Sequence, residues 1–208
     1  MHAPLAERMR PQTLDDFVGQ DHLVGPEGIL RHYLNQNVMP SLLFWGPPGV
    51  GKTTLAQLLA HGRPFHQLSA IQSGVKEVRA VIEQAKKADG LFDAKKAILF
   101  IDEIHRFSKS QQDSLLGAVE KGWITLIGAT TENPSFEVIP ALRSRCQLYT
   151  LNPLGKEDLQ SIVDTALKKD ILLKEKKITI SENKALFRYA GGDARRLLNL
   201  LDPCVGGT

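Results

Sequence analysis

The amino-acid sequence predicts an α/β fold, with a mostly parallel sheet covered by helices and a small helical unit after it. Three observations predict it: short apolar runs typical of buried strands, segments of helical periodicity between them, and a change to helices alone after Asn152 and Pro153. Strands that are separated by helices of this length pair in parallel and bury both faces of the sheet. A chain of 208 residues can form one good core and a small second unit.

Four apolar runs are the clearest predicted strands. Each is short and ends at polar or turn-forming residues, as a buried strand of a parallel sheet does. A fifth, more polar run at 65–69 could be a further strand. The four clear runs are 41–45, 97–101, 123–129 and 147–151.

Apolar residues at helical spacing predict helices between these strands. The segments are 53–60, 73–87 and 108–122. Ser73 is a candidate N-cap for the second helix, and Gly122 is expected to close the third.

The last quarter of the chain has no clear strand. It predicts three helices with a brief extended segment between the first and the second, so we expect an α/β core over 1–152 and a helical unit over 153–208. Because a proline and a Gly-Gly pair follow, we expect the last helix to stop at 202 and the chain to be a truncated piece. The three helices are 155–169, 181–190 and 192–202, and the extended segment is 177–180.

Composition and charge limit the classes of function. No stretch approaches the roughly 20 apolar residues of a membrane-spanning helix, and the N-terminus lacks the apolar core of a secretory signal. Cys146 and Cys204 give neither a disulfide framework nor metal-ligand spacing, so we expect a protein of the reducing cytoplasm. The formal net charge of +3 permits contact with nucleic acid but does not by itself predict it.

A glycine-rich stretch joins the first predicted strand to the helix after it. GPPGVGKT (46–53) fits the pattern G-x-x-x-x-G-K-[ST] of a phosphate-binding loop, in which glycines let backbone N–H groups point at the phosphates. The following helix N-terminus adds a favourable partial charge. Lys52 is expected to reach the β- and γ-phosphates of a nucleotide, and Thr53 to bind Mg²⁺. The predicted nucleotide contacts here are Gly46, Pro47, Pro48, Gly49, Val50, Gly51, Lys52, Thr53 and Thr54.

Two acids, Asp102 and Glu103, directly follow the strand at 97–101. Ligands of open α/β sheets bind at the carboxyl ends of the strands. Asp102 is expected to orient Mg²⁺, directly or through water, and Glu103 to polarise the attacking water. Alone, these acids could merely cap the next segment, but beside a phosphate-binding loop they favour hydrolysis of a nucleotide.

Polar residues also follow the strand at 123–129. Thr130, Thr131 and Asn133 could each position a water near the γ-phosphate, although such residues after a strand are often only turn residues. A small-molecule kinase would need an acceptor pocket, for which the sequence shows no sign. Hydrolysis is therefore favoured over phosphoryl transfer to a metabolite.

Two arginines, Arg143 and Arg145, lie between a helical segment and the strand at 147–151. The nearest acids along the sequence are Glu137 and Glu157, so neither guanidinium has an acidic neighbour in the sequence. These arginines could serve the chemistry of this chain, that of another copy, or only the surface.

These motifs resemble those of AAA+ ATPases of the clamp-loader branch, and most closely the RarA/MgsA family, which is related to Werner-helicase-interacting proteins. SGVKEVR, DEIHRFSKSQQD and GATTENPSF are far more specific than the phosphate-binding loop. The matching stretches are PLAERMRPQTLDDFVGQDHLVG (4–25), SLLFWGPPGVGKTTLA (41–56), LSAIQSGVKEVRAVIEQA (68–85), ILFIDEIHRFSKSQQD (98–113), LIGATTENPSFEV (126–138) and GGDARRLLNLL (191–201).

The resemblance implies roles for further residues. Thr131 falls where the family carries its sensor 1. Arg195, in Gly-Asp-Ala-Arg, matches sensor 2, which reaches the γ-phosphate from a helical lid, and Arg196 is the less favoured choice. The adenine side of the site would be lined by Arg10, Pro11, Val18, Gly19 and Gln20.

Arg145 lies in Ser-Arg-Cys, the motif that carries the arginine finger in clamp-loader ATPases. The finger completes the active site of an adjacent subunit and can contribute a factor of about 10³ or more to the rate. We therefore expect Arg145 to be free of a carboxylate partner. Arg143 stands where the family often has leucine, and it stays unassigned.

The function that the resemblance implies is that of a DNA-dependent ATPase of replication-fork maintenance and recombination, with ATP or ADP and Mg²⁺ as cofactors. It would work as a homo-oligomer, with ATP at subunit interfaces, while this piece alone would be a slow ATPase and monomeric. Forks or single-strand/duplex junctions and single-stranded DNA-binding protein would be its partners, at the nucleoid in the cytoplasm. Ser73, Gly74 and Lys76 would face the DNA backbone.

Two alternatives remain open from the sequence. One is another AAA+ DNA motor, either a clamp-loader subunit or a branch-migration helicase of the RuvB type. The other is a nucleotide-gated scaffold with little turnover, against which the intact Lys52, Asp102 and Glu103 argue.

Overall fold

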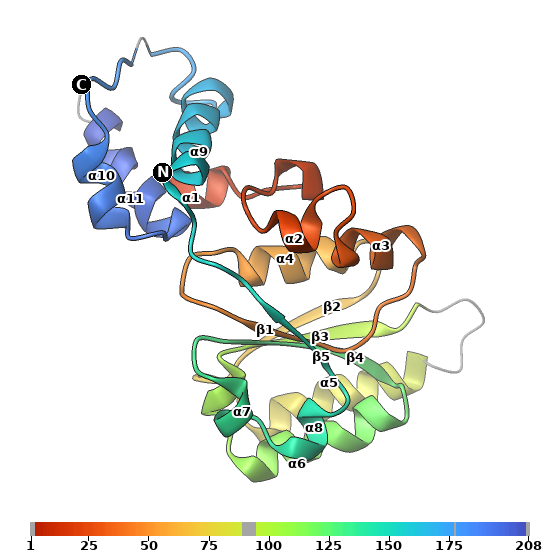
Figure 1. The fold of residues 1–208 in the computed structure, drawn as a ribbon. Coiled ribbons are helices and arrows are strands. Elements are labelled where there is room, and N and C mark those ends of the chain that lie inside the picture. The colour runs from red at the N-terminus through yellow and green to blue at the C-terminus, as the bar shows by residue number, and fades with distance from the viewer. Residues whose placement is uncertain (1–2, 89–94, 177, 207–208) are drawn as a thin grey trace.

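The computed structural model in Figure 1 describes residues 3–88, 95–176 and 178–206. A five-stranded sheet of order β2-β3-β4-β1-β5 lies at its centre, and all paired strands are parallel. The predicted α/β fold is confirmed, and the uncertain strand at 65–69 is present. The strands are β1 (Leu42–Trp45), β2 (Phe65–Ser69), β3 (Ala97–Asp102), β4 (Ile124–Thr130) and β5 (Gln147–Thr150).

Two apolar cores lie on opposite faces of the sheet. In β3, Ile98 and Phe100 belong to one core, and Leu99 and Ile101 belong to the other. Successive side chains of a strand point to opposite faces, so a strand that is covered on both sides must be apolar at every position. This alternation explains why the central strands read as continuous apolar runs.

Helices cover both faces, and the helices predicted between the strands are confirmed (Figure 1). One face carries α2 (Asp21–Val24), α3 (Ile29–Asn35) and α4 (Lys52–Leu59), and the other carries α5 (Val75–Ala88), α6 (Lys109–Glu120), α7 (Pro134–Glu137) and α8 (Pro140–Arg143). Two 3-10 turns lie at Leu14–Asp16 and Ile104–Arg106. None of the helices in the described ranges has the length and apolar character needed to cross a membrane.

The chain after β5 forms a helical unit of α9 (Lys156–Lys169), α10 (Lys184–Ala190) and α11 (Ala194–Gly206). The prediction that the last helix stops at 202 was wrong, because α11 continues through Pro203. Leu201 and Val205 are buried in the core of the unit, and this packing holds the last turn although Pro203 lacks an N–H. Of the segment predicted to be extended, 178–180 joins neither helix nor strand, and Lys177 lies outside the described residues.

The N-terminal segment packs onto the helical unit. Leu5, in α1 (Leu5–Arg8), is fully buried in the core of that unit, and its N–H donates to Asp202 Oδ2 at 3.0 Å. Arg8 binds Asp170 through two hydrogen bonds, Nε to Oδ2 at 2.7 Å and Nη2 to Oδ1 at 3.0 Å. These bonds hold the pKa of the Asp170 carboxyl below its ordinary value. The segment before the sheet is thus tied to the helices after it.

Breaking the Arg8–Asp170 pair is expected to destabilise the fold in a pH-dependent way. Arg8→Met leaves the Asp170 side chain, which is 1% exposed, without its charge partner, at a cost of about 3 kcal/mol. Since the folded-state pKa of Asp170 is lowered, the pair stabilises fully above about pH 5 and loses its effect as the pH falls below about 4. Urea unfolding should give free energies of unfolding that differ at neutral pH and converge in acid.

Lys184→Met is the matched control. Lys184 and Glu182 are 3.8 Å apart and both well exposed, so this change is expected to alter the free energy of unfolding by less than about 0.5 kcal/mol. A difference between wild type and Arg8→Met that stays constant from neutral pH into acid would contradict the assignment to the Asp170 charge.

Candidate nucleotide-binding site

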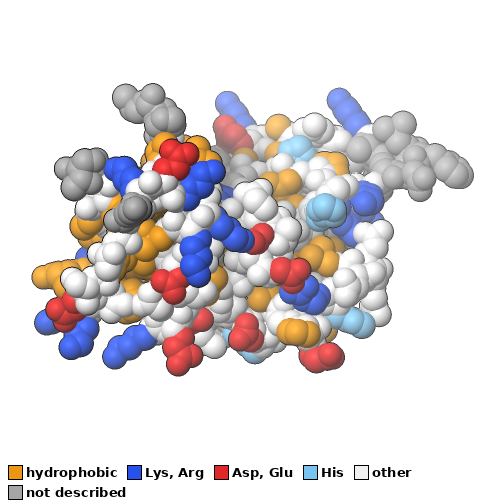
Figure 2. Space-filling model, turned by 90° about the horizontal axis from the view of Figure 1, so that it is seen from above, with side chains coloured by type: hydrophobic (Ala, Val, Ile, Leu, Met, Phe, Trp, Pro, Cys, Tyr) orange, Lys and Arg blue, Asp and Glu red, His pale blue; other side chains and the backbone are white. Residues whose placement is uncertain are grey.

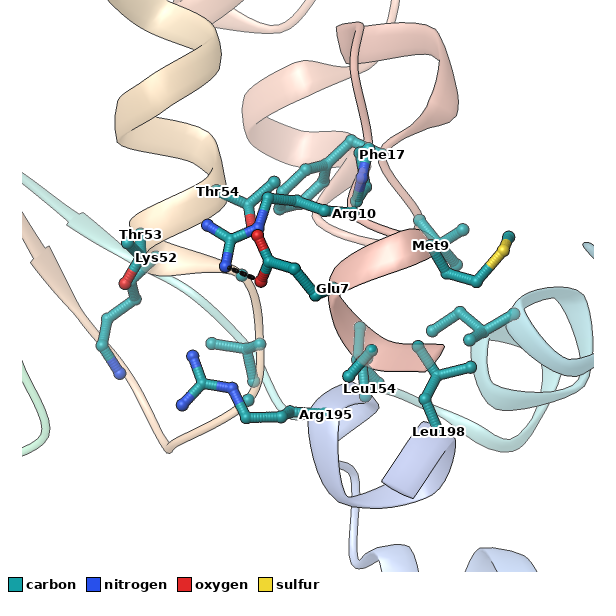
Figure 3. Close-up of a pocket in the computed structure, with 18 of the residues that line it drawn as sticks. Glu7, Met9, Arg10, Phe17, Lys52, Thr53, Thr54, Leu154, Arg195 and Leu198 are labelled. Carbon is teal, nitrogen blue, oxygen red and sulfur yellow. Dashed lines mark hydrogen bonds and ion pairs between the residues drawn. The ribbon is translucent and has the colours of Figure 1, made fainter. Parts of the chain in front are cut away.

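A cavity of about 420 Å³ lies between the carboxyl edge of the sheet and the helical unit (Figure 3). It is lined by α1 and the segment after it, the loop before α4, the end of β3, and helices α9 and α11. Thirteen of the predicted nucleotide-binding and catalytic residues line it. These are Arg10, Pro11, Val18, Pro48, Gly49, Val50, Gly51, Lys52, Thr53, Thr54, Asp102, Glu103 and Arg195.

The loop at 46–53 is closed on itself around Lys52. The Lys52 ammonium is buried and donates to the backbone oxygens of Gly46 at 2.7 Å and Pro47 at 2.8 Å. Burial lowers the pKa of Lys52, and the charges of Glu103 and Asp102 oppose this shift. The carbonyl oxygens of Gly46 and Pro47 therefore bind the Lys52 ammonium, and neither residue lines the cavity.

Two glycines of the loop have a conformation and surroundings that exclude side chains. Gly51 caps α4 at φ +96°, and a Cβ there would lie 2.5 Å from the Phe17 ring. Gly49 is at φ +72°, and a Cβ would lie 1.8 Å from Asp193 Oδ1. Glycine tolerates positive φ without steric cost. The loop is thus enclosed by Phe17 on one side and by the start of α11 on the other.

Asp102 and Glu103 meet Lys52 at the carboxyl end of β3. Burial raises the pKa of the Asp102 carboxyl, the Glu103 charge raises it further, and Lys52 opposes the shift. Glu103 has a left-handed backbone, with φ +54°, which turns the chain sharply after the strand. The two acids therefore enter the cavity from one strand end.

The residues present fit a magnesium ion that accompanies a nucleotide. The Thr53 hydroxyl and the Asp102 carboxylate both line the cavity and are oxygen ligands, which Mg²⁺ prefers. Among the described residues no group of three or more His, Cys, Asp and Glu side chains forms a metal cluster. Mg²⁺ is usually held by one or two carboxylates together with phosphate oxygens and water.

Of the three polar residues predicted near the end of β4, Thr131 contacts Glu103 and Thr130 contacts His105. Thr131 Oγ1 donates to Glu103 Oε2 at 3.3 Å, and the ring of His105 lies between Glu103 and Thr130. Asn133 is the N-cap of α7 and accepts from the Ser135 N–H at 2.9 Å, so it has a structural role. His105 was not among the residues predicted from the sequence. In the sequence, the one feature that could have indicated a role for it was its polar side chain two positions after Glu103.

On the opposite side of the cavity, Arg10 donates to Glu7 at 2.6 Å (Figure 3). It also donates to the Gln57 side-chain oxygen at 2.8 Å. The predicted residues Gly19 and Gln20 do not line the cavity. Gly19 packs against Leu154 and Asp158, and the Gln20 amide bonds to both backbone groups of Asn152. An apolar wall that could receive a nucleobase was not predicted, because its members come from distant segments. It consists of Met9, Leu154, Ile162 and Leu198.

The start of α11 touches the phosphate-binding loop. Figure 3 shows Arg195 reaching toward the side of the cavity where Lys52 lies, and its charge lowers the pKa of Lys52. The Ala194 N–H donates to the Gly49 carbonyl at 3.1 Å. Arg196 is not among the lining residues, and its backbone N–H donates to Asp193 at 2.8 Å. The structure therefore brings Arg195, but not Arg196, to the predicted site.

Arg145 lies outside the cavity and is not free. Its guanidinium pairs with the Glu120 carboxylate and donates to the Ala141 carbonyl at 2.7 Å. The expectation that Arg145 has no carboxylate partner was wrong, because α6 packs against α8 and brings Glu120 close. The two side chains are 39% and 42% exposed, and such pairs contribute less than about 1 kcal/mol. Arg143, previously unassigned, donates to the Ser135 carbonyl at 2.6 Å and so ties α8 to α7.

Of the three DNA candidates, Ser73 and Gly74 lie in the connection from β2 to α5 and Lys76 in the first turn of α5, and none of them lines the cavity. Lys76 is exposed, and Ser73 and Gly74 are half-buried. The Gly74 N–H donates to Glu77 Oε2 at 2.8 Å. A carboxylate therefore already occupies the backbone group that a DNA phosphate would contact. The DNA role of these residues stays a prediction.

Comparison with known proteins places this site in a family. Residues 42–154 match the model of the ATPase family associated with various cellular activities (AAA). The chain is 47% identical over 204 residues to Replication-associated recombination protein A of Coxiella burnetii, with 96% of this chain and 46% of that protein covered. It is 46% identical over 207 residues to ATPase WRNIP1 of Dictyostelium discoideum, with 98% and 23% covered.

A solved structure of a RuvB variant from Thermotoga maritima has a similar fold, with a TM-score of 0.72 and 26% sequence identity. The match covers 93% of this chain and 64% of that one. This chain spans less than half of the two curated relatives named above. The matched family segment contains β1, the phosphate-binding loop, both acids and Arg145, and the chain belongs to the ATPase family associated with various cellular activities (AAA).

Proposed function

We propose that the protein binds ATP with Mg²⁺ in this cavity and hydrolyses it. The observation that carries this proposal is the convergence of Lys52, Asp102, Glu103 and Arg195 on one cavity beside a phosphate-binding loop. Two cations and two carboxylates in one enclosed site match what phosphoryl transfer to water requires, namely charge neutralisation and a base. The α/β core over 1–152 would bind the phosphates, and the unit over 153–208 would act as a lid.

In the proposed mechanism, Lys52 exchanges the carbonyl groups of Gly46 and Pro47 for the β- and γ-phosphates. Thr53 and Asp102 would hold Mg²⁺, which neutralises phosphate charge when bound. Glu103 would accept a proton from the water that attacks the γ-phosphate, and Thr131 would orient Glu103. Arg195 would bind the γ-phosphate from the helical unit, so that ATP would draw this unit and the loop together.

We further propose that the full protein is a homo-oligomer in which Arg145 completes the site of a neighbouring copy. Arg145 lies outside the cavity of its own chain, and its exposed pair with Glu120 costs little to break. The guanidinium could therefore exchange a carboxylate for the γ-phosphate of another copy.

For the biological role, we propose a DNA-dependent ATPase of replication-fork maintenance and recombination. The names of the relatives, Replication-associated recombination protein A and ATPase WRNIP1, support it. Forks or single-strand/duplex junctions are the proposed substrates, with single-stranded DNA-binding protein as a partner, at the nucleoid in the cytoplasm. On the face seen in Figure 2, the acidic and basic side chains of the described residues are interspersed. The proposed DNA contacts are Ser73, Gly74 and Lys76.

ATP turnover by the full-length protein tests this role. We expect forked or gapped DNA to stimulate turnover more than blunt duplex does, and more weakly as salt rises, since phosphate contacts release counterions. Lys52→Ala is the control for contaminating ATPase activity. Turnover that every DNA structure leaves unchanged would contradict DNA dependence while leaving the ATPase proposal intact.

A further inference from the structure

The Glu103 carboxylate is held at one oxygen by two side chains. Glu103 Oε2 lies 3.2 Å from His105 Nδ1 and 3.3 Å from Thr131 Oγ1. The same His105 nitrogen lies 2.9 Å from Thr130 Oγ1. Thr130 is fully buried, and the side chain of His105 is 11% exposed. The contacts thus form a chain from the sheet interior to the acid.

The hydrogen-bonding capacities of these groups determine the direction of each bond. The hydrogen bond at His105 Nδ1 is made with Thr130, while its 3.2 Å approach to Glu103 is an ion-pair contact. Because the Thr130 hydroxyl donates its own proton to the Glu132 carbonyl, the His105 nitrogen must carry the proton in the bond to Thr130. Thr130 Oγ1 then accepts from His105 and from the Glu132 N–H at 3.0 Å, and donates its own proton to the Glu132 carbonyl at 3.2 Å. This arrangement fixes Nδ1–H as a donor to Thr130, with the Glu103 carboxylate 3.2 Å from the same nitrogen.

The second oxygen of Glu103 remains available to the cavity. Among the described residues no hydrogen bond is made to Oε1, whereas Oε2 accepts from Thr131 and lies 3.2 Å from His105 Nδ1. Glu103 lines the cavity beside Asp102 and Lys52. A carboxylate with one oxygen occupied and the other open presents a single acceptor in a defined direction. Its position matters, because a small displacement of a catalytic group can lower the rate by about 100-fold.

We propose that His105 is a positioning residue for hydrolysis: its Nδ1–H, anchored by Thr130, holds Glu103 Oε2 so that Oε1 faces the attacking water. The inference rests on the proposed function, in which Glu103 is the general base. His105 acts through Glu103 and touches neither the nucleotide nor the water. It should therefore affect kcat and leave nucleotide binding unchanged.

Replacing His105 in the full-length protein tests the assignment. His105→Ala removes the donor and is expected to lower kcat by about 10- to 100-fold, with KM for ATP and Kd for ADP within about twofold of wild type. His105→Asn keeps an N–H close to the place of Nδ1 and should restore kcat to within about threefold. His105→Gln keeps the polarity but moves the donor further out, so it should be impaired like His105→Ala. His61→Ala, at an exposed histidine outside the cavity, is the matched control and should match wild type.

The results separate this inference from the proposed function. If Glu103→Gln lowers kcat strongly but His105→Ala stays within twofold, only the positioning role is wrong. A rise in kcat, or an Asn variant as impaired as the Ala variant, also overturns it. If Glu103→Gln turns over ATP like wild type, both the general base and its positioning residue are wrong. Thermal unfolding and ADP binding of each variant exclude loss of the fold as the cause.

Discussion

The Glu103→Gln variant is expected to bind ATP like wild type and to hydrolyse it at least about 100-fold more slowly. The amide has the size of the carboxylate and can still accept from Thr131, which donates to Oε2 at 3.3 Å, while His105 Nδ1 lies 3.2 Å from that oxygen. It cannot accept a proton from water. Single-turnover hydrolysis measures the chemical step, and titration with a fluorescent ATP analogue measures binding.

Glu132→Gln is the matched control for this substitution. Glu132 follows the end of β4, close in the chain to Thr131, but its side chain is exposed. We expect this variant to keep both the affinity and the rate. If Glu103→Gln loses binding together with turnover, the carboxylate holds the nucleotide or its metal ion rather than activating water. Hydrolysis by Glu103→Gln at the wild-type rate would remove Glu103 from the mechanism.

Elements that depend on local pattern could be predicted from the sequence. The continuous apolar runs of β1, β3 and β4 follow from burial on both faces, and each strand was placed within two residues of its observed bounds. The phosphate-binding loop and the Asp102–Glu103 pair could be predicted because each is a contiguous stretch. The parallel order of the strands then brings these two stretches to one edge of the sheet.

Contacts between distant segments could not be predicted in the same way. Glu120 meets Arg145 only because α6 packs on α8, and the apolar wall of the cavity combines Met9 with residues of α9 and α11. Asp193 was not among the predicted residues, although its carboxylate packs against Gly49. Pro203 was taken as a helix end because its local propensity is unfavourable, whereas the burial of Val205 outweighs it.

The contact between the helical unit and the loop has a mechanical consequence. The Ala194 N–H bonds to the Gly49 carbonyl, and Arg195 is the next residue of the same helix turn. A nucleotide that changes the conformation of the loop must therefore strain or move the start of α11. Arg8 links that unit back to the segment that supplies Arg10 to the cavity. We therefore expect nucleotide binding in the cavity to be coupled to the helical unit through these contacts.

Mixing two inactive variants of the full-length protein is expected to restore ATP turnover. Arg145→Ala keeps its own phosphate-binding loop but cannot complete a neighbour's site, with a loss of about 10³-fold in the rate. Lys52→Ala cannot bind the phosphates but still offers Arg145. In a head-to-tail oligomer, an Arg145→Ala pocket next to a Lys52→Ala subunit is complete. Random equal mixing should therefore restore about a quarter of the wild-type turnover.

The controls for this experiment separate a shared site from a structural role of the arginine. Arg143→Ala should lose the bond to the Ser135 carbonyl and yet need no complementation, because Arg143 holds α8 to α7 within its own chain. Glu120→Gln should keep full turnover, since the exposed pair contributes less than about 1 kcal/mol and Arg145 must leave it to act. Native mass spectrometry shows whether the two variants assemble together. If they do and turnover stays at the level of the separate variants, Arg145 does not act on a neighbouring site, and its contacts with Glu120 and Ala141 are its whole role.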